Sequence, residues 1–261
     1  MRESPYVLHG ADVGHSTAMN YAVVGEKVSA SYKAVFQQYR RDDEIEVASQ
    51  NHRHLSGILR DLTTAFPHPV RVLEAGCGTG RYFHCLKNVE ELVGLDVCPE
   101  MLQAAEHPVL EDEITVPNIR LMCENIYLAS LRANFFHVIY SLGMFGNGCP
   151  VTPEILGRFH AWLAPGGKLF FNVVDEATLM PSARLKRRVK RVLYPVLPDV
   201  VQKTLDEREN RMPFFGLTKS ALEQIMKQTA FSSWRIHRHV CQSPLWQGVL
   251  LECRAQKTQL P

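Results

Sequence analysis

The chain has 261 residues, of which 46% are apolar and 21% are charged, and its formal net charge at pH 7 is only +2. These values predict one α/β domain with embellishments and give no global electrostatic case for nucleic-acid binding. The seven cysteines are scattered and include no C-x-x-C pair, which indicates reduced thiols. No signal-peptide pattern and no run of about 18 apolar residues occurs, so we expect a cytoplasmic protein without a transmembrane segment.

The first part of the chain, residues 1–66, is predicted to form an N-terminal helical cap, and residues 67–261 are predicted to form the core domain. Apolar and aromatic side chains recur at helical spacing over residues 21–39 and again over 55–62, and the acidic run 42–44 separates the two segments. Two prolines then end the second helix before the first strand. We therefore expect two helices in this region.

An apolar strand followed by three glycines at alternate positions is the most informative stretch of the chain. The strand ends on Glu74, and the glycines are Gly76, Gly78 and Gly80. Apolar residues resume at helical spacing over 82–89, which predicts a strand, a tight turn and a helix. Glycines let backbone N–H groups approach a ligand closely, and a helix N-terminus presents unpaired donors. The stretch is typical of a nucleotide-binding loop.

The spacing and the acid favour a ligand with an ammonium group over a dinucleotide. A dinucleotide turn needs a third glycine three positions after the second, and here that position is Arg81 or Phe83. The carboxylate of Glu74 would also repel a pyrophosphate but attract an ammonium group. The second predicted strand, 92–96, ends on Asp96, whose carboxylate can accept hydrogen bonds from ribose hydroxyls. Together these features indicate a nucleoside ligand.

The rest of the chain continues the alternation of strands and helices. A glycine-interrupted loop, 141–148, follows the fourth strand at the carboxyl edge of the sheet, where ligands bind in open α/β sheets, so Ser141 and Asn147 are candidate site residues. The predicted strands are 119–126, 135–141, 169–174, 234–241 and 249–253, and a helix is predicted over 153–163.

A second motif precedes the fifth predicted strand, where residues 163–167 have the form L-x-P-G-G. Together with the E-x-G-x-G-x-G turn, it resembles the class I S-adenosylmethionine-dependent methyltransferases. The segment that begins at Asp96 is similar to the D-x-S-P-x-M segment of that family, with Cys98 in place of serine. The resemblance covers about residues 71–254. It implies an α/β fold with a doubly wound, mostly parallel seven-stranded sheet. An insertion at about 176–212 interrupts the resemblance, and we expect it to form a helical lid.

The resemblance also implies S-adenosyl-L-methionine as the cofactor. In that family the glycine loop holds the methionine part of the cofactor, the acid before the loop lies beneath its amino group, and the acid of the second strand binds ribose. Met101 would face the adenine ring, and Asn125, or Glu124 if the register is shifted by one, would accept a bond from the adenine amino group. The implied cofactor-binding residues are Glu74, Gly76, Cys77, Gly78, Gly80, Asp96, Val97, Met101, Asn125, Ile126 and Ser141.

No catalytic residue is assigned, because transfer from a sulfonium needs a general base only when the acceptor is weakly acidic. His15, Tyr21 and Asn147 are candidates for a role in the acceptor pocket, over which the cap of the resembled family closes. Tyr32 and Tyr39 are either pocket-lining or packing residues.

Two His-Arg-His triplets, 52–54 and 237–239, invite a test for metal binding, because alternate residues of a strand share a face. Only the second triplet lies on a predicted strand, and no carboxylate or thiolate stands at a metal-binding spacing from either. We interpret both as structural or surface residues and expect no metal.

The insertion carries six cations between residues 184 and 191 and no acid between Glu176 and Asp199. Apolar residues recur at helical spacing over 185–196, which predicts a basic amphipathic helix. Three interpretations stay open: a solvated face over a packed stripe, a lid for an anionic or lipid-like acceptor, and a membrane-surface or nucleic-acid contact. A peripheral membrane contact would run through residues 184–197.

The sequence favours methyl transfer to a small molecule, with O-, N- and C-methylation all open. No N-P-P-Y or D-P-P-Y segment follows the fourth predicted strand, which argues against nucleobase methylation, and no nucleic-acid partner is expected. Because the sulfonium is an activated leaving group, the protein mainly positions the reactants and excludes water. The alternative is a member of the same fold that binds the cofactor without methylating, in a pericyclic or binding role.

Neutralising Arg187 and Arg188 together tests the lid interpretation of the insertion. If these cations attract an anionic acceptor, the double variant should raise the KM of that acceptor. The defect should shrink with salt, because the Debye length is about 10 Å at 0.1 M. Steady-state kinetics at two ionic strengths measures this, with cofactor affinity as the control. If the double variant loses binding to anionic vesicles but keeps its kinetics, the membrane contact is supported instead. If neither the kinetics nor vesicle binding changes, the cations form a solvated face.

Overall fold

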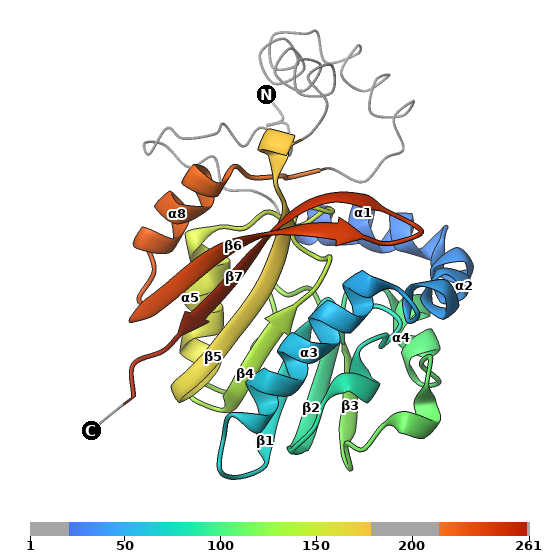
Figure 1. Ribbon diagram of the computed structural model, residues 1–261, viewed down its shortest axis with the longest axis horizontal. Coiled ribbons are helices and arrows are strands. Elements are labelled where there is room, and N and C mark those ends of the chain that lie inside the picture. Colours follow the sequence, from blue (N-terminus) through green and yellow to red (C-terminus); the bar gives the residue numbers. More distant parts are fainter. Residues whose placement is uncertain (1–20, 179–213, 260–261) are drawn as a thin grey trace, which may run out of the picture.

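The computed structural model describes residues 21–178 and 214–259, in which three helices precede the strands and the helices between them (Figure 1). The strands are β1 (Val70–Ala75), β2 (Val89–Asp96), β3 (Ile119–Cys123), β4 (Phe136–Ser141), β5 (Leu163–Val174), β6 (Ser233–Gln242) and β7 (Gln247–Gln256). The helices are α1 (Tyr21–Lys33), α2 (Phe36–Glu46), α3 (Gln50–Thr64), α4 (Pro99–Ala105), α5 (Pro153–Trp162) and α8 (Lys219–Lys227). Three short 3-10 turns are η1 (Phe83–Cys85), η2 (Glu111–Glu113) and η3 (Glu176–Thr178).

The strands form one seven-stranded sheet in the order β3-β2-β1-β4-β5-β7-β6. Strands β1 to β5 run parallel, and β7 is antiparallel to both β5 and β6. The strand order reverses between β1 and β4, and open α/β sheets bind ligands at the carboxyl ends of strands beside such a switch point. The expected mostly parallel sheet and its closing antiparallel pair are therefore confirmed.

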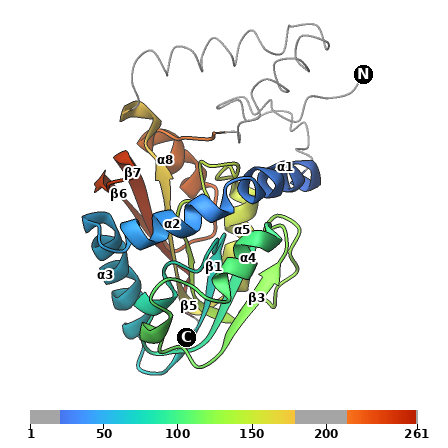
Figure 2. The same ribbon diagram turned by 90° about the vertical axis from the view of Figure 1, so that its right-hand side faces the viewer.

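Helices cover both faces of the sheet, because successive residues of a strand point to opposite faces. Leu73 and Val93 pack in a buried cluster with side chains of α5 and α8, whereas Val72 and Leu92 pack in a second cluster with α3 and α4. Figure 2 shows α3 on one side of the sheet and α5 on the other. Strands that are buried along nearly their whole length, such as β1, are typical of a sheet covered on both faces. The doubly wound arrangement follows.

The described part of the cap contains three helices where two were expected. The acidic run 42–44 does not separate helices but lies inside α2, where Asp43 is fully buried. Its carboxylate accepts hydrogen bonds from Thr79 Oγ1 and Arg81 Nε, which fixes α2 to the glycine turn. The local sequence pattern could not reveal this role, because the partners lie more than thirty residues along the chain. In Figure 2, α1 and α2 lie across the end of the sheet where the parallel strands finish.

The segment after the glycine turn is not the helix expected over residues 82–89. It contains only the 3-10 turn η1, and Val89 begins β2. Val89 is the register partner of Val70, whose N–H donates to the carbonyl of Asn88 at 2.9 Å. Strand pairing therefore overrides the helical spacing of the apolar side chains, and the turn gains no dipole from a following helix.

Two strand boundaries also differ from the prediction. Strand β3 ends at Cys123 rather than at residue 126, because the chain turns at Asn125, whose side chain accepts the Tyr127 N–H. The L-x-P-G-G stretch is an irregularity within β5 rather than a turn before it. Gly166 has a φ of +74°, and the register against β4 shifts before Lys168.

Several predictions concern residues outside the described ranges. They include His15, the basic segment 184–197 and, apart from η3, the helical lid at 176–212, so these assignments stay predictions. No helix within 21–178 or 214–259 combines the length and apolarity needed to cross a membrane. None of the seven cysteines forms a disulfide.

Asp43→Ala should lower the free energy of unfolding by about 3 kcal/mol, because Arg81 and Thr79 lose a buried partner. Glu44→Ala, at the neighbouring exposed position of α2, should change it by less than about 0.5 kcal/mol. Urea unfolding of both variants measures the difference. Equally small effects would show that this carboxylate does not hold the cap.

Candidate functional site

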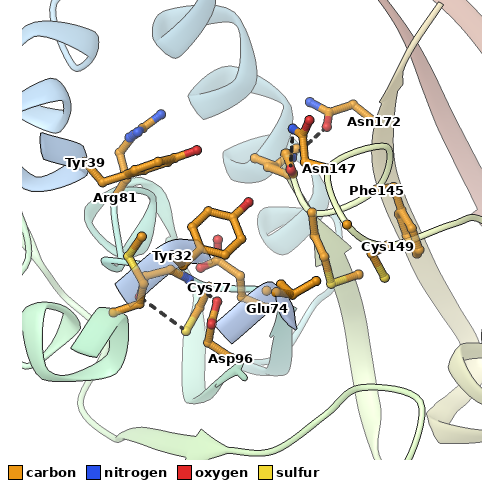
Figure 3. A pocket seen from close by; sticks show the side chains of 18 of the residues that line it. Tyr32, Tyr39, Glu74, Cys77, Arg81, Asp96, Phe145, Asn147, Cys149 and Asn172 are labelled. Atoms are coloured by element: carbon orange, nitrogen blue, oxygen red, sulfur yellow. Dashed lines mark hydrogen bonds between the residues drawn. The ribbon is translucent and has the colours of Figure 1, made fainter. Parts of the chain in front are cut away.

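A cavity of about 650 Å³ lies at the carboxyl ends of the parallel strands, under the cap (Figure 3). Its walls come from the glycine turn, the ends of β1 and β2, the loops after β3 and β4, the helices α1 and α2, and the hairpin of β6 and β7. The predicted site residues that line it are Glu74, Gly76, Cys77, Gly78, Asp96, Val97, Met101, Asn125, Ile126 and Asn147.

Three predicted residues do not line the cavity. Gly80 has a φ of +75°, and a Cβ there would stand 2.7 Å from the Phe83 ring, so this glycine shapes the turn. Ser141 is fully buried at the end of β4. The ring of Tyr21 stacks on that of Tyr127, with centroids 4.1 Å apart, which makes Tyr21 a packing residue of α1.

The glycine turn and the end of β2 are joined through Asp96. The backbone N–H groups of Gly78 and Cys98 each donate to one oxygen of its carboxylate, both at 2.9 Å. Burial raises the pKa of Asp96, although these hydrogen bonds oppose the shift. Gly78 has a φ of +53°, and a Cβ added there would meet no atom within 4 Å. The carboxylate is thus held in a fixed orientation, and the backbone of the turn is open to a ligand.

Glu74 is a buried acid at the base of the cavity, with only 2% of its surface exposed. Tyr140 of β4 is its register partner and donates a hydrogen bond of 2.7 Å to Oε2. Burial raises the pKa of Glu74 to about 8, against the opposing effect of the Tyr140 bond. The group is therefore mostly neutral at pH 7 without a ligand, and a bound cation would favour its carboxylate form.

Asn125 links α1 to the loop after β3. Its Nδ2 donates to the Tyr21 carbonyl at 2.6 Å, and its Oδ1 accepts from the Tyr127 N–H at 3.0 Å. Helix α1 comes this close because of Gly25, where a Cβ would stand 2.3 Å from Asn125 Nδ2. One lone pair of Oδ1 is left for a ligand. The neighbouring Glu124, the alternative predicted adenine contact, also lines the cavity.

Two asparagines hold the wall that follows β4. Asn147 Nδ2 donates to the carbonyl of Gly143 at 3.1 Å, and Asn172 Oδ1, on β5, accepts from the Gly143 N–H at 2.9 Å. Both side chains line the cavity, as Figure 3 shows. An amide neither gives nor takes a proton near neutral pH. Asn147 can therefore position an acceptor but cannot act as its base.

Most of the wall opposite the sheet was not predicted from the sequence. The polar interruption of an apolar strand by Asn172 was a usable signal, and the pocket-lining alternative for Tyr32 and Tyr39 agrees with the structure. The local sequence of the β6–β7 hairpin does not predict that it lines the cavity, because the strand order of the sheet is what brings it there. The unpredicted polar or aromatic lining residues include Glu46, Asn51, Thr79, Arg81, Tyr82, Asn172, Ser243 and Trp246.

The described lining of the cavity is acidic. Its carboxylates belong to Asp42, Glu46, Glu74, Asp96 and Glu124. The guanidinium of Arg81 is the one cation among the lining residues within 21–178 and 214–259, and it is paired with Asp43. The same lining contains no histidine. The field of this site therefore favours a positively charged ligand over an anion.

Residues 72–167 match the family model of a methyltransferase domain. This span contains the glycine turn, Asp96 and the L-x-P-G-G stretch, and it supplies the parallel strands at whose ends the cavity lies. This span is therefore a methyltransferase domain, in agreement with the resemblance to the class I S-adenosylmethionine-dependent methyltransferases. S-adenosylmethionine is accordingly the cofactor of this methyltransferase. No curated protein matches the sequence.

Solved methyltransferase structures share the fold of this one. 1,6-Didemethyltoxoflavin-N1-methyltransferase from Burkholderia thailandensis has 17% identity and a TM-score of 0.60, over 96% of this chain and 94% of that one. The N-methyltransferase NodS from Bradyrhizobium japonicum WM9 has 16% identity and a TM-score of 0.58, over 87% and 98%. Magnesium protoporphyrin IX methyltransferase from Synechocystis PCC 6803 has 13% identity and a TM-score of 0.57, over 90% and 100%. At such identities the likeness shows the fold alone.

The raised pKa of Glu74 predicts that the cofactor-free methyltransferase loses stability between about pH 5 and pH 8. In this range the folded protein keeps a proton that the unfolded chain, with a Glu pKa near 4.3, has released, so the free energy of unfolding falls as the pH rises. Glu74→Gln keeps an acceptor for Tyr140 and should remove a slope of up to about 1.4 kcal/mol per pH unit. Urea unfolding across this range measures both proteins. Identical slopes would contradict the assignment.

Proposed function

We propose that this methyltransferase moves the methyl group of S-adenosylmethionine to a small-molecule acceptor bound in the same cavity. One observation carries the proposal: a single cavity of about 650 Å³ joins the glycine turn, Glu74 and Asp96 to a second wall from α2 and the β6–β7 hairpin. Sites for small molecules have volumes of about 300–1,000 Å³. The space therefore suits a cofactor and a small acceptor better than a macromolecular segment.

The cofactor fits the side of the cavity that the sheet forms. We place its ammonium group at Glu74, which the cation would keep ionised, and its ribose hydroxyls at Asp96. The backbone at Gly78 allows close approach of the methionine part, because no Cβ stands in the way. Met101 and Asn125 are the proposed adenine contacts, with Val97 and Ile126 beside them in the lining.

The acceptor end of the cavity favours a neutral or basic molecule. The carboxylates of Asp42 and Glu46 remain there when Glu74 and Asp96 are assigned to the cofactor. The charge of Arg81 is already engaged by a buried partner. An anionic or lipid-like acceptor would depend on the cations of the insertion, outside the described ranges. We therefore propose a neutral or amine acceptor, with the anionic class as the alternative that the insertion would support.

Positioning supplies most of the chemistry in this proposal. The sulfonium is already activated, so the cavity needs to align the acceptor atom with the methyl group and to exclude water. An amine acceptor attacks in its neutral form, and the carboxylate of Asp42 lies in the lining near the acceptor end, whereas both oxygens of Glu46 already accept hydrogen bonds. Asn147 and Asn172 offer hydrogen bonds that orient the acceptor.

Two of the similar structures support a small acceptor. The toxoflavin enzyme was solved with 1,6-didemethyltoxoflavin and S-adenosylhomocysteine bound. The magnesium protoporphyrin IX enzyme was solved with S-adenosylhomocysteine bound. Both proteins are named for the methylation of small molecules, and this chain spans nearly the whole length of each.

S-adenosylmethionine and S-adenosylhomocysteine should bind to the purified chain, and NAD should not, because the turn lacks the third dinucleotide glycine and carries Glu74. Titration calorimetry compares the three ligands. Transfer of a labelled methyl group to a panel of neutral, amine and anionic acceptors then tests turnover. Tight NAD binding without a response to S-adenosylmethionine would overturn the function. Cofactor binding without transfer to any acceptor would favour the non-methylating alternative.

Asp96→Ala should weaken S-adenosylhomocysteine binding by about 1.5–3 kcal/mol, the cost of losing charge-assisted hydrogen bonds. Glu90→Ala removes an exposed acid from the opposite end of the same strand and should leave the affinity unchanged. Calorimetry measures both variants, and circular dichroism checks that they are folded. Unchanged affinity in folded Asp96→Ala would remove this residue from the site.

A further inference from the structure

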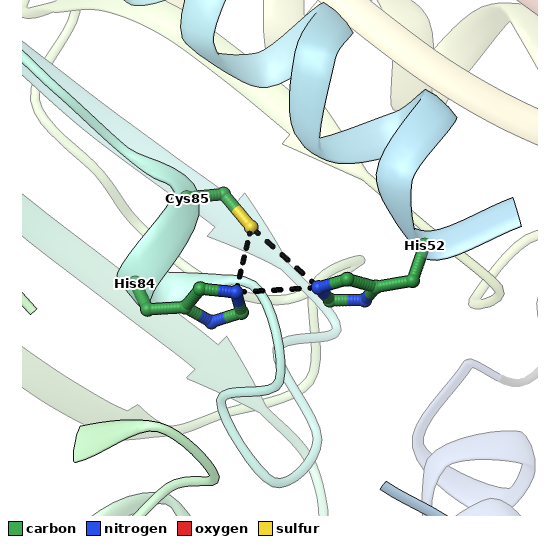
Figure 4. Close-up of side chains that lie close together, drawn as sticks. All are labelled: His52, His84 and Cys85. Atoms are coloured by element: carbon green, nitrogen blue, oxygen red, sulfur yellow. Dashed lines mark hydrogen bonds between the residues drawn. The ribbon is translucent and has the colours of Figure 1, made fainter. Parts of the chain in front are cut away.

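Three side chains with metal-binding chemistry meet next to the cavity but outside it (Figure 4). His52 comes from the first turn of α3, and His84 and Cys85 come from the 3-10 turn η1. His52 and Cys85 are buried, whereas His84 is partly exposed, which leaves a path for an ion from solvent. The proposed methyl transfer uses none of the three.

The separations between the three ligand atoms match those around one metal ion. His52 Nε2 and His84 Nε2 are 3.2 Å apart, and Cys85 Sγ lies 3.3 Å from His84 Nε2 and 3.9 Å from His52 Nε2. Tetrahedral Zn²⁺ with ordinary bond lengths requires about 3.3 Å between two nitrogens and about 3.6 Å between nitrogen and sulfur. The circle through the three observed atoms has a radius of about 2.0 Å, which is a metal–ligand distance.

We propose that His52, His84 and Cys85 form a binding site for a divalent cation of intermediate softness, with Zn²⁺ as the best-fitting ion. Two imidazole nitrogens and a thiolate favour Zn²⁺ over Mg²⁺ or Ca²⁺, which prefer oxygen ligands. The fourth position is open to a water molecule or to Ser56, whose Oγ lies 2.9 Å from Cys85 Sγ. Binding forms a metal–sulfur bond and releases the thiol proton to solvent.

The surroundings of the cluster suit this chemistry. Burial and the neighbouring imidazole lower the pKa of His52 to about 4, so its ring is neutral and its lone pair is available at pH 7. Burial raises the pKa of Cys85 to about 11, against the opposing effects of the Ser56 hydrogen bond and the nearby cations, so the thiol keeps its proton until an ion displaces it. In the absence of an ion, a hydrogen bond links only two of the three ligand atoms through one proton. A cation at the centre accepts a lone pair from all three.

The site lies directly behind the cofactor wall. The His52 ring stacks on the Tyr82 ring, with centroids 5.0 Å apart, and Tyr82 lines the cavity. A bound ion would therefore join α3 of the cap to the segment that follows the glycine turn. Its expected effect is to hold these two elements together, and it touches no proposed cofactor contact.

A second group, His54, His239 and Glu252, is a weaker candidate. The two imidazole rings stack face to face, with centroids 3.9 Å apart and planes 8° from parallel. Rings that overlap face to face at this separation carry their lone pairs side by side, so the lone pairs do not converge on one ion. The His52 and His84 rings are also within 14° of parallel, but their centroids are 5.2 Å apart and their Nε2 atoms face each other (Figure 4). The His54 Nε2 atom is also paired with Glu252 Oε1 at 2.8 Å. We interpret this group as a hydrogen-bonded stack of side chains, and it serves as a control in the metal-binding experiment.

Cobalt substitution tests the proposal on the full chain. The reduced protein is treated with a chelator and titrated with Co²⁺, and then with Zn²⁺ against a chromophoric chelator. One Co²⁺ per chain should give an absorption from thiolate-to-cobalt charge transfer together with the bands of a tetrahedral ion. Zn²⁺ should displace it, and Mg²⁺ in excess should not. A wild-type spectrum without a thiolate band would overturn the proposal regardless of any variant.

Matched variants assign the ligands. Cys85→Ser should abolish the thiolate band, and both Cys85→Ser and His84→Ala should weaken Zn²⁺ binding by more than the roughly 10–100-fold that loss of an outer-shell partner costs. Cys123→Ser, at an exposed thiol, and His239→Ala, in the stacked pair, should keep both the band and the affinity. Circular dichroism confirms that each variant is folded. A site retained in Cys85→Ser but lost in His239→Ala would place the ion in the other group and refute the assignment.

Discussion

A carboxylate at the end of a parallel strand is enclosed by the strands on either side of it. The rest of this molecule depends on that constraint. Glu74 has Gly94 of β2 on one side and Tyr140 of β4 on the other. Asp96 ends the next strand in the same direction, so two acids face one edge of the sheet. Like charges in such a place are costly unless donors or a cation lie between them. The glycine turn supplies the donor at Gly78, and neutral Glu74 removes one of the two charges until a cation arrives.

The site is completed by parts of the chain that are distant in sequence. Helices α1 and α2 precede the sheet, and the β6–β7 hairpin follows it, yet both reach the same cavity. Glu46 shows how they meet, since it accepts hydrogen bonds from Ser49 and Asn51 near the start of α3 and from Ser243 of the hairpin. In the proposed arrangement the sheet holds the cofactor side of the cavity, and these segments form the acceptor side. This division explains how one fold serves different acceptors.

The fold and the cavity lining at the ends of the parallel strands were predictable from the sequence, because their signals are local. The glycine turn, Asp96 and the L-x-P-G-G stretch each need a particular residue type at a fixed offset from a strand. The remaining features depend on contacts between distant segments. From the sequence alone, Asp43 is predicted to be a surface acid, and only the fold places Arg81 beside it. Likewise, His52 is predicted to be an isolated histidine, and only the position of η1 brings His84 and Cys85 close to it. The helix expected after the turn was wrong because pairing of Val89 with Val70 decides that segment.

The ion pair between α2 and the glycine turn also sets an order of events during synthesis. The cap helices α1 and α2 are 13 and 11 residues long, and isolated helices of that length are marginal in water. Asp43 finds its partners only after residues 79–81 have been made, and α1 finds Asn125 later still. These two helices thus settle only after segments that follow them in the chain have been made. Until residue 125 has been made, α1 has no partner at Asn125, so this helix cannot yet cover the carboxyl ends of the first strands (Figure 2).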